Sequence, residues 1–387
     1  MKYLSKIKKS FYAGKTVVVR LDLNVAPEEL HSSVRVDRSL PTLRLLRDAG
    51  CRVVILSHRG RPDARQQRAK KAAASSSLEP LAAVLAGRLK TKIVFDASFD
   101  LRAVPVRARA LPPGGLMLLE NIRLWPEEEK NDTTFAKKLA AIGDLYVNDA
   151  FAVSHRAQAS VDAVTRYVPA CVGLELEKEI RALDAAMRKP KRPLVLVLGG
   201  VKISDKVGVL KNFWRRADAV LVGGGVANTF FAAQGKPIGS SVFEKDAEKI
   251  IAPFMGSKKI RLPSDTVVGG GAIFDIGAHT AQEYARRIKN AGTVVWNGPM
   301  GYIEKKQYQA GTLAVARSCA RSKAFCVVGG GETTSFFLSH TISAKNVFLS
   351  TGGGAMLEYL AGQKLPGIEA LKKNAKKKTD RRYAKKK

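Results

Sequence analysis

Strongly apolar runs of Val, Ile and Leu recur along the chain and alternate with stretches of helical periodicity. The runs are apolar at consecutive positions, which is typical of strands in a parallel sheet whose two faces are both covered by helices. Amphipathic stretches lie between them, for example at residues 38–49, 78–89 and 135–142. This alternation predicts an α/β protein with parallel sheets.

The residues that follow these runs change in kind halfway along the chain. In the first half they are Arg, His, Asn and carboxylates, in the segments VVVRLDLN (17–24), VVILSHRGRP (53–62), LMLLENIR (116–123) and LYVNDAFAVSHR (145–156). In the second half most are glycines, in the segments LVLVLGGVK (194–202), AVLVGGGV (219–226), CVVGGGE (326–332) and FLSTGGG (348–354).

The two halves therefore predict two kinds of site, because ligands of open parallel sheets bind at the carboxyl ends of the strands. The side chains of the first half suit a small polyanion. The glycines of the second half allow backbone N–H groups to approach phosphates closely. An anion site and a phosphate site in one chain suggest phosphoryl transfer between an anionic metabolite and a nucleotide.

The chain has 387 residues, which is enough for two domains with their own cores. We predict two Rossmann-like three-layer α/β domains with parallel sheets, joined by a hinge helix. The N-terminal domain comprises residues 1–170 and holds the acid substrate. The C-terminal domain comprises residues 171–371, holds the nucleotide and includes the hinge helix, at residues 174–190.

The chain is strongly basic, with a formal net charge of +32. Residues 372–387 hold ten Lys or Arg and one Asp, so this segment contributes +9 and leaves +23 on the rest. A basic segment of low complexity predicts a disordered, solvated tail. Weak contact with RNA or another polyanion is the functional alternative. An acidic substrate accounts for only part of the remaining charge.

The sequence favours a cytoplasmic protein. It has no apolar run long enough to span a bilayer, and no apolar segment typical of a secretory signal follows the N-terminal lysines. Four cysteines lie far apart without a CxxC pair, which argues against a zinc site: Cys51, Cys171, Cys319 and Cys326. Free thiols are typical of a reducing compartment.

Polar side chains that follow the strands of the first half are candidates for the anion site: Arg20, Asp22, Asn24, Arg35, His58, Arg61, Arg123, His155 and Arg156. One arginine after a strand is usually a surface charge, but several after different strands of one sheet meet at the same edge. Arginine matches phosphate and carboxylate oxygens with two parallel hydrogen bonds. Asp22 and Asn24, two apart, face the same side and can accept from a hydroxyl while orienting an arginine. His155 is a candidate for orienting Arg156.

The second half carries three candidate groups for a nucleotide. Lys202 and Lys206 lie on one face if a helix begins directly after the strand, beside phosphates at its N-terminus, although a solvated lysine pair fits the spacing equally well. VVGGGETT (327–334) predicts a phosphate loop with Glu332 for magnesium, or simply a capped helix start. Glu304 is a candidate for ribose hydroxyls, or a surface carboxylate.

Over residues 12–368 the chain resembles the phosphoglycerate kinase family. The resemblance rests on long segments in the same order, among them VRLDLNV, SHRGRP, LLENIRLWPEEEKND, YVNDAFAVSHRAQAS, LGGVKISDKVGVL, VWNGPMGYIE, VVGGGETT and LSTGGGAMLEYL. It implies reversible phosphoryl transfer between 1,3-bisphosphoglycerate and ADP, giving 3-phosphoglycerate and ATP in glycolysis or gluconeogenesis. It also implies Mg²⁺, in-line transfer with hinge-bending domain closure, and a monomer.

The same resemblance assigns the site residues. The implied ligands of the acid substrate are Asp22, Asn24, Arg35, His58, Arg61, Arg123 and Arg156. The implied ligands of the nucleotide are Lys202, Lys206, Glu304, Gly330, Gly331, Glu332 and Thr333. Arg35 and Lys202 are the implied catalytic contacts to the migrating phosphoryl group, and Glu332 is the implied magnesium ligand.

Two of the departures from the family pattern bear on magnesium and on the nucleotide. Glu332 stands where the family has aspartate, which extends the carboxylate by one carbon and bears on magnesium affinity because Mg²⁺ demands near-ideal octahedral geometry. Ile273 stands where the family usually has glycine, and we expect its branched side chain to narrow the adenine pocket.

Two other classes of function fit part of the sequence. The net charge and the lysine-rich C-terminus suggest a nucleic-acid-binding protein built on a kinase scaffold. The anion site also fits a kinase that acts on a different acyl phosphate or carboxylate.

Overall fold

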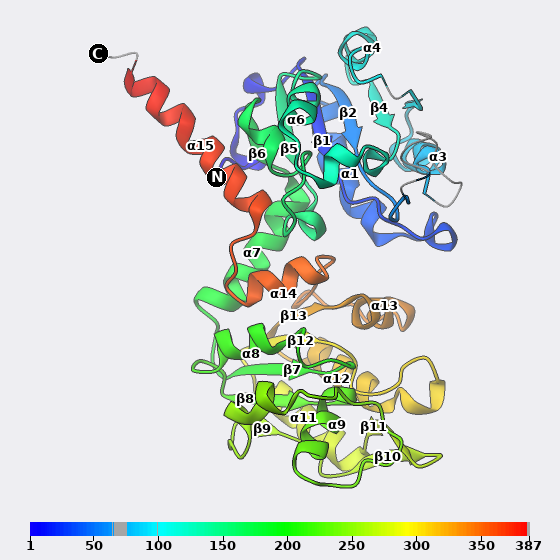
Figure 1. The fold of residues 1–387 in the computed structure, drawn as a ribbon, viewed down its shortest axis with the longest axis vertical. Helices are drawn as coiled ribbons and strands as arrows, with labels where there is room; N and C mark the ends of the chain where they lie inside the picture. Colours follow the sequence, from blue (N-terminus) through cyan, green and yellow to red (C-terminus); the bar gives the residue numbers. More distant parts are fainter. Residues whose placement is uncertain (64, 66–75, 99, 385–387) are drawn as a thin grey trace. The chain divides into compact units, whose positions relative to one another are not determined.

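The computed structural model describes residues 1–63, 65, 76–98 and 100–384, and side chains of the C-terminal segment as far as residue 376. The chain forms two compact units (Figure 1). The first comprises Met1–Glu179 and Lys364–Lys387, and the second comprises Ile180–Gln363. Among the described residues, no helix has the length and apolar character that crossing a membrane requires. The four cysteines are free, as predicted, and all four are buried.

The first unit is built around a parallel sheet of six strands in the order β3-β4-β2-β1-β5-β6. The strands are β1 (Thr16–Arg20), β2 (Arg52–Leu56), β3 (Ile93–Asp96), β4 (Leu116–Leu119), β5 (Leu145–Asn148) and β6 (Ala170–Val172). Every residue of β1, β4 and β5 is buried. The apolar runs of the sequence therefore lie inside the molecule on both sheet faces, as the pattern predicted.

Helices of this unit pack on the sheet, and the residues Val19, Leu43, Leu46, Ile55 and Leu85 of β1, α1, β2 and α3 share one core. The helices are α1 (Val34–Arg47), α3 (Glu79–Leu89), α4 (Val104–Ala110), α5 (Pro126–Glu129), α6 (Thr133–Ala140) and α15 (Pro366–Ala384). Single 3₁₀ turns lie at η1 (Leu4–Lys6), η2 (Lys9–Phe11), η3 (Pro27–Glu29), η4 (Ile122–Leu124), η5 (Phe151–Val153) and η6 (Ala163–Arg166).

The second unit repeats this plan with a six-stranded parallel sheet in the order β14-β13-β12-β7-β8-β9. Its strands are β7 (Leu194–Leu198), β8 (Ala219–Val222), β9 (Ile260–Arg261), β12 (Thr293–Asn297), β13 (Phe325–Gly329) and β14 (Val347–Leu349). A separate antiparallel hairpin, β10 (Thr266–Gly269) and β11 (Ala272–Ile276), was not predicted. The predicted α/β class with two parallel sheets is confirmed.

The helices of the second unit cover its sheet, and Trp296 of β12 lies in their core beside Tyr284 and Phe337. They are α8 (Val207–Phe213), α9 (Gly224–Ala233), α10 (Glu248–Ile251), α11 (Ala278–Lys289), α12 (Ala310–Arg321), α13 (Gly331–Ser339) and α14 (Gly354–Leu360), with 3₁₀ turns η7 (Ala252–Phe254) and η8 (Lys306–Tyr308). Helix α7 (Leu174–Arg188) matches the helix predicted at 174–190, and the division between the units falls inside it.

The unit boundaries differ from the predicted domains at both ends of the second unit. The first unit extends to Glu179 instead of residue 170, because Asp149, after β5, holds the N-terminus of α7. Its Oδ1 accepts hydrogen bonds from Glu175 N at 2.8 Å and Leu176 N at 3.0 Å. The chain also returns to the first unit at Lys364, seven residues before the predicted end of the C-terminal domain.

The prediction of a disordered tail from residue 372 is wrong as far as the structure describes that segment. Helix α15 begins at Pro366 and runs to Ala384. The Asn374 side chain ties it to the first unit, donating to Val168 O at 3.0 Å and accepting from Ala170 N at 3.0 Å. Ala, Lys and Arg are good helix formers, so the anchored helix continues along the basic segment. Residues 385–387 lie outside the described part.

The buried carboxyl of Asp149 makes the stability of the first unit pH-dependent. Burial raises the pKa of this carboxyl to about 6, so the folded state binds a proton at a pH where the unfolded state has lost it. Stability from this group therefore grows as the pH falls. We expect the difference in melting temperature between the native chain and Asp149→Asn to change in favour of the native chain as the pH falls from about 7 to about 5. Calorimetry at both values measures it, and a pH-independent difference would contradict it.

Candidate active site

Four neighbouring strands of the first unit, β4, β2, β1 and β5, end at one edge of the sheet. The predicted ligands follow these strands: Asp22 and Asn24 after β1, His58 and Arg61 after β2, Arg123 after β4 and Arg156 after β5. Arg35 comes instead from the first turn of α1 and forms an ion pair with Asp22. Asp22 thus orients an arginine, as predicted. Both Asp22 and Asn24 lie beyond the end of β1 and not on the strand itself.

His58 is the electrostatic centre of this edge. Burial lowers the pKa of its imidazole well below the usual value, and the positive charges of Arg20, Arg123, Arg156 and Arg35 lower it further. Arg20 donates from Nη2 to His58 Nδ1 at 3.0 Å. Because a guanidinium can only donate, Nδ1 must be unprotonated. His58 is therefore neutral, with its remaining proton on Nε2.

A buried hydrogen-bond network holds the Arg20 guanidinium in place. Its Nε donates to Ser160 Oγ at 3.0 Å, and Ser160 Oγ donates to Glu128 Oε1 at 2.6 Å. Its Nη1 donates to Leu21 O at 2.6 Å. The side chains of Arg20 and Glu128 are both fully enclosed. The negative charge of the Glu128 carboxylate balances the Arg20 guanidinium through Ser160. The network therefore holds Arg20 in a fixed position at the positively charged edge of the sheet.

Arg123 and Asn24 are fixed by the loop after β2. Arg123 donates from Nη1 to Gly60 O at 2.8 Å, and Gly60 N donates to Asn24 Oδ1 at 2.8 Å. Burial, followed by the charges of Arg20 and Arg156, lowers the pKa of Arg123 to about 10. Arg156 Nε contacts His155 Nε2 at 3.2 Å, which supports the predicted orienting role of His155. Arg61 is exposed.

In the second unit, glycines allow the main chains at the strand ends to lie very close to one another, because no side chains separate them. Gly298, after β12, has φ +90°, and a Cβ atom there would lie 2.2 Å from the carbonyl oxygen of Gly199, after β7. A Cβ atom on Gly199 would lie 2.0 Å from Pro299 O. A side chain at either position would force these strand ends apart. The close packing leaves an edge lined by main-chain groups, as the glycine runs predicted.

The two predicted lysines are not on one helical face, because α8 begins at Val207, after both of them. Residues 199–206 form a loop and turn in which Lys206 Nζ donates to Lys202 O at 3.1 Å. Burial lowers the pKa of Lys206, while the nearby carboxylates of Asp205, Glu332 and Glu244 raise it. Lys202 is exposed. The loop, and not a helix, thus brings Lys206 toward the charge of Glu332.

The predicted phosphate loop lies where β13 leads into α13. Gly330 has φ +96° and precedes α13, so Gly331 and Glu332 lie in the first turn of that helix. Thr333 is buried, and its Oγ1 accepts from Gly298 N at 3.1 Å. The N-terminus of α13 presents backbone donors and a partial positive charge, which suits a phosphate.

A cavity of about 720 Å³ lies in the second unit, within the usual range for a small-molecule site. Its lining includes Gly200, Glu304 and Glu332, and also Ile273, the residue that departs from the family pattern. Lys202 and Lys206 are not part of the lining, although a Cβ atom on Gly200 would lie 3.7 Å from Lys206 Nζ.

Glu332 fits a magnesium ion that is bound mainly by nucleotide phosphates. Among the residues that the structure describes, no three His, Cys, Asp or Glu side chains gather as a metal site. Mg²⁺ in nucleotide sites needs only one or two carboxylates, because phosphate oxygens and water supply the other ligands. The exposed carboxylate of Glu332 at the head of α13 meets that requirement.

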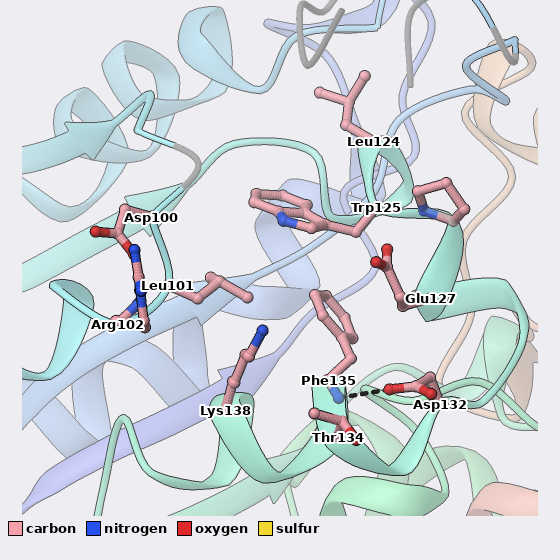
Figure 2. Close-up of a pocket in the computed structure, with 11 residues that line it drawn as sticks. Asp100, Leu101, Arg102, Leu124, Trp125, Glu127, Asp132, Thr134, Phe135 and Lys138 are labelled. Atoms are coloured by element: carbon pink, nitrogen blue, oxygen red, sulfur yellow. Dashed lines mark hydrogen bonds and ion pairs between the residues drawn. The ribbon is translucent and has the colours of Figure 1, made fainter. Parts of the chain in front are cut away.

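A second cavity, of about 700 Å³, lies in the first unit, and none of the predicted ligands lines it (Figure 2). Its floor includes Trp125 and Phe135, whose ring centroids are 6.0 Å apart. Asp100 and Arg102 lie on one side of these rings and Glu127 on the other (Figure 2). Charges of both signs do not suit a multiply negative substrate, so the cavity is not assigned to it.

Two polar residues of these edges were not predicted. Asn297 ends β12 and is buried, and its Nδ2 has no hydrogen-bond partner among the described residues. It follows the same strand-end rule as the predicted ligands, so the signal was present in VVWNGP. Glu128 is the buried partner in the Arg20 network. No local pattern distinguishes it from Glu127 and Glu129, which are exposed neighbours in the same acidic run.

Comparison with known proteins gives a single answer. The sequence matches the family described as phosphoglycerate kinase over residues 7–363. The chain is 39% identical to phosphoglycerate kinase of Herpetosiphon aurantiacus, over 93% of this chain and 97% of that protein. It is 40% identical to that of Moorella thermoacetica, over 92% and 96%. The chain belongs to the phosphoglycerate kinase family.

Solved structures of the phosphoglycerate kinase family agree. The structure is similar to phosphoglycerate kinase from Coxiella burnetii, with a TM-score of 0.83, 36% identity, and coverage of 96% of this chain and 99% of that one. It is also similar to the enzyme from Pyrococcus horikoshii OT3, with a TM-score of 0.84, 32% identity, and coverage of 97% and 100%. The resemblance drawn from the sequence is thus confirmed.

The neutral state of His58 can be tested directly. We expect its imidazole to remain neutral as the pH falls from about 7.5 to about 5.5, because burial and four arginines oppose protonation. NMR of ¹³C-labelled histidine follows the titration, and loss of one signal in His58→Gln assigns it. Protonation of His58 near its ordinary value of 6.5 would contradict the assignment.

Proposed function

We propose that the protein catalyses reversible phosphoryl transfer between 1,3-bisphosphoglycerate and ADP, which gives 3-phosphoglycerate and ATP. It is thereby a phosphotransferase with a carboxyl group as acceptor, acting in glycolysis or gluconeogenesis. The observation that carries the proposal is the set of arginines around neutral His58, since their combined charge suits a substrate with both a carboxylate and a phosphate.

We assign the ligands of the glycerate by their chemistry. Arg61, Arg123 and Arg156 hold the distal phosphate and the carboxyl oxygens, with His58 donating from Nε2. Asp22 and Asn24 receive the substrate hydroxyl. The ion pair with Asp22 supports a fixed orientation of Arg35, which we assign to the oxygens of the migrating phosphoryl group. Preorganised donors of this kind stabilise charge that develops in the transition state.

We assign the nucleotide to the cavity of the second unit. Glu304 holds the ribose hydroxyls, and Gly330, Gly331 and Thr333 form the phosphate loop with the N-terminus of α13. Lys206 neutralises nucleotide phosphates, and Lys202 contacts the migrating group together with Arg35. Glu332 would hold Mg²⁺, which would neutralise phosphate charge.

The rest of the proposal concerns the setting of the reaction. Phosphoryl transfer requires in-line positioning of the two substrates without water, which we propose is reached by bending at α7 and at residues 350–354. We further propose that the protein acts as a cytoplasmic monomer. A kinase for another acyl phosphate remains the competing function, and parallel assays with glycerate, acetate and carbamoyl substrates separate the two.

The role of Arg35 gives the main test. We expect Arg35→Ala to lower kcat by about 10²–10³, because one preorganised charge on the transferring group is lost. Nucleotide affinity should stay unchanged, since Arg35 belongs to the other substrate. A coupled assay and calorimetry measure the two. Arg44→Ala is the control, because Arg44 lies on the same helix and donates to Arg88 O at the surface. Near-normal turnover of Arg35→Ala would refute the assignment.

We also propose that the basic C-terminal segment makes weak contact with nucleic acid or another polyanion. Residues 377–387 hold seven Lys or Arg and one Asp, and they follow the anchor at Asn374. Truncation after Lys376 should therefore keep the fold and turnover. It should reduce both the affinity for single-stranded RNA and the dependence of that affinity on salt. Unchanged, salt-insensitive RNA binding would remove the idea.

A further inference from the structure

The two edges of the parallel sheet in the second unit differ strongly in charge. Taken together, the four residues before each of its six strands include ten Lys or Arg and one Asp, a net charge of +9. The four residues after each strand include one Lys, one Asp and one Glu, a net charge of −1. Because all six strands are parallel, the residues before them lie at one edge, opposite the glycine-lined edge. We call it the amino edge.

Only part of the charge at the amino edge is used within the fold. Arg192 forms an ion pair with Asp218, and Lys259 Nζ donates to Trp214 O at 2.8 Å. Before each strand, at least one exposed cation forms no ion pair with a residue that the structure describes. In the order of the sheet from β14 to β9, these cations are Lys345, Lys323, Lys289, Lys191, Arg215 and Lys258. Like charges gathered in this way repel one another, and an anionic partner would relieve the repulsion.

Main-chain hydrogen bonds fix the segments of the amino edge side by side. Cys326 N donates to Asn346 O at 2.8 Å, which joins the starts of β13 and β14. Phe325 N donates to Gly292 O at 3.1 Å, and Gly292 N donates to Pro193 O at 2.8 Å. Neighbouring strands lie about 4.8 Å apart, so the six strands place their cations in a row of about 24 Å.

The other side chains of the amino edge narrow the choice of partner. None of the large apolar side chains that are exposed in the described part of the chain lies in these six segments. Docking on a membrane surface depends largely on such side chains, which enter the lipid. The half-buried ring of Trp214 contacts Phe254, with centroids 4.7 Å apart, and Lys259 Nζ. The edge therefore offers positive charge without a free aromatic ring on which a base could stack.

We propose that the amino edge of the second unit binds the phosphate backbone of single-stranded RNA without reading its sequence. A single row of cations can follow the phosphates of one strand, and binding releases the counterions of those phosphates. Contacts to phosphates alone carry no sequence information. This surface is separate from the basic C-terminal segment, which belongs to the first unit. It lies at the edge opposite the proposed nucleotide site, so the inference does not depend on the proposed function.

The test is the binding of a labelled uridine RNA of about 20 nucleotides to the full-length chain, followed by fluorescence anisotropy at several KCl concentrations. The double variant Lys289→Gln, Lys323→Gln removes two neighbouring charges of the row. We expect it to bind about 10-fold more weakly and to lower the slope of log affinity against log salt by about 1.4, since each phosphate contact on a single strand contributes about 0.7. An RNA of the same length and mixed sequence should behave alike.

A matched control separates the row from the net charge of the chain. Lys245 and Lys306 are exposed in the same unit and lie outside the amino edge, so Lys245→Gln, Lys306→Gln changes the net charge equally. This variant should keep the wild-type affinity and salt dependence. The C-terminal segment is present in every protein compared, so its contribution cancels. Equal loss of binding in the two double variants would overturn the proposal.

Turnover and a second probe complete the test. Lys289→Gln, Lys323→Gln should keep kcat and KM, and RNA should not compete with ATP or 3-phosphoglycerate. Competition would place the RNA at an active-site edge, and the proposal would fall. Vesicles of phosphatidylcholine and phosphatidylserine are the second probe: if they bind through Lys289 and Lys323 and RNA does not, the surface serves lipid and the proposal is wrong. A chain without turnover would refute the proposed function alone, because the anisotropy measurement does not require catalysis.

Discussion

The buried guanidinium of Arg20 is the group on which the first unit's site depends. A charge inside a protein is expensive unless its hydrogen bonds are made and its charge is balanced. Here every Arg20 nitrogen has a partner, and Glu128 supplies the opposite charge through Ser160. The network therefore fixes His58 as a neutral hydrogen-bond donor. Because its imidazole is uncharged, it does not repel the arginines that surround it. An edge rich in positive charge is thus kept ready before the substrate binds.

The strand ends of the second unit differ from those of the first, because they present main-chain groups in place of charged side chains. Glycines at these positions make that possible, since they carry no side chain. Where β7 and β12 end, glycines allow carbonyl and N–H groups to pass within distances that a Cβ atom would forbid. The cost is entropic, because each glycine loses more freedom on folding than any other residue. The same sheet architecture thereby serves a side-chain site in one unit and a backbone site in the other.

The sequence predicted those features of the fold and the site that follow from local residue patterns and from the fact that parallel strands end at the same edge of a sheet. It located eight of the strands, the class of both sheets and the helix at α7, because consecutive apolar residues and strand-end polarity are visible without tertiary contacts. It missed the end of the second unit, since the return of the chain at Lys364 depends on the contacts of Asn374 with residues far away in sequence. It left open whether Lys202 and Lys206 share a helical face, because spacing alone cannot show that α8 begins one residue after Lys206.

Asn228 illustrates the limit for a site. In the sequence it is one polar residue in the apolar helix of VGGGVANTFF, and a residue of that kind usually satisfies a structural hydrogen bond. It does make such a bond, to Val242 O, and that bond consumes the donor half of the amide. Only the distances and the burial show that the acceptor half is left over, next to a stack of aromatic rings.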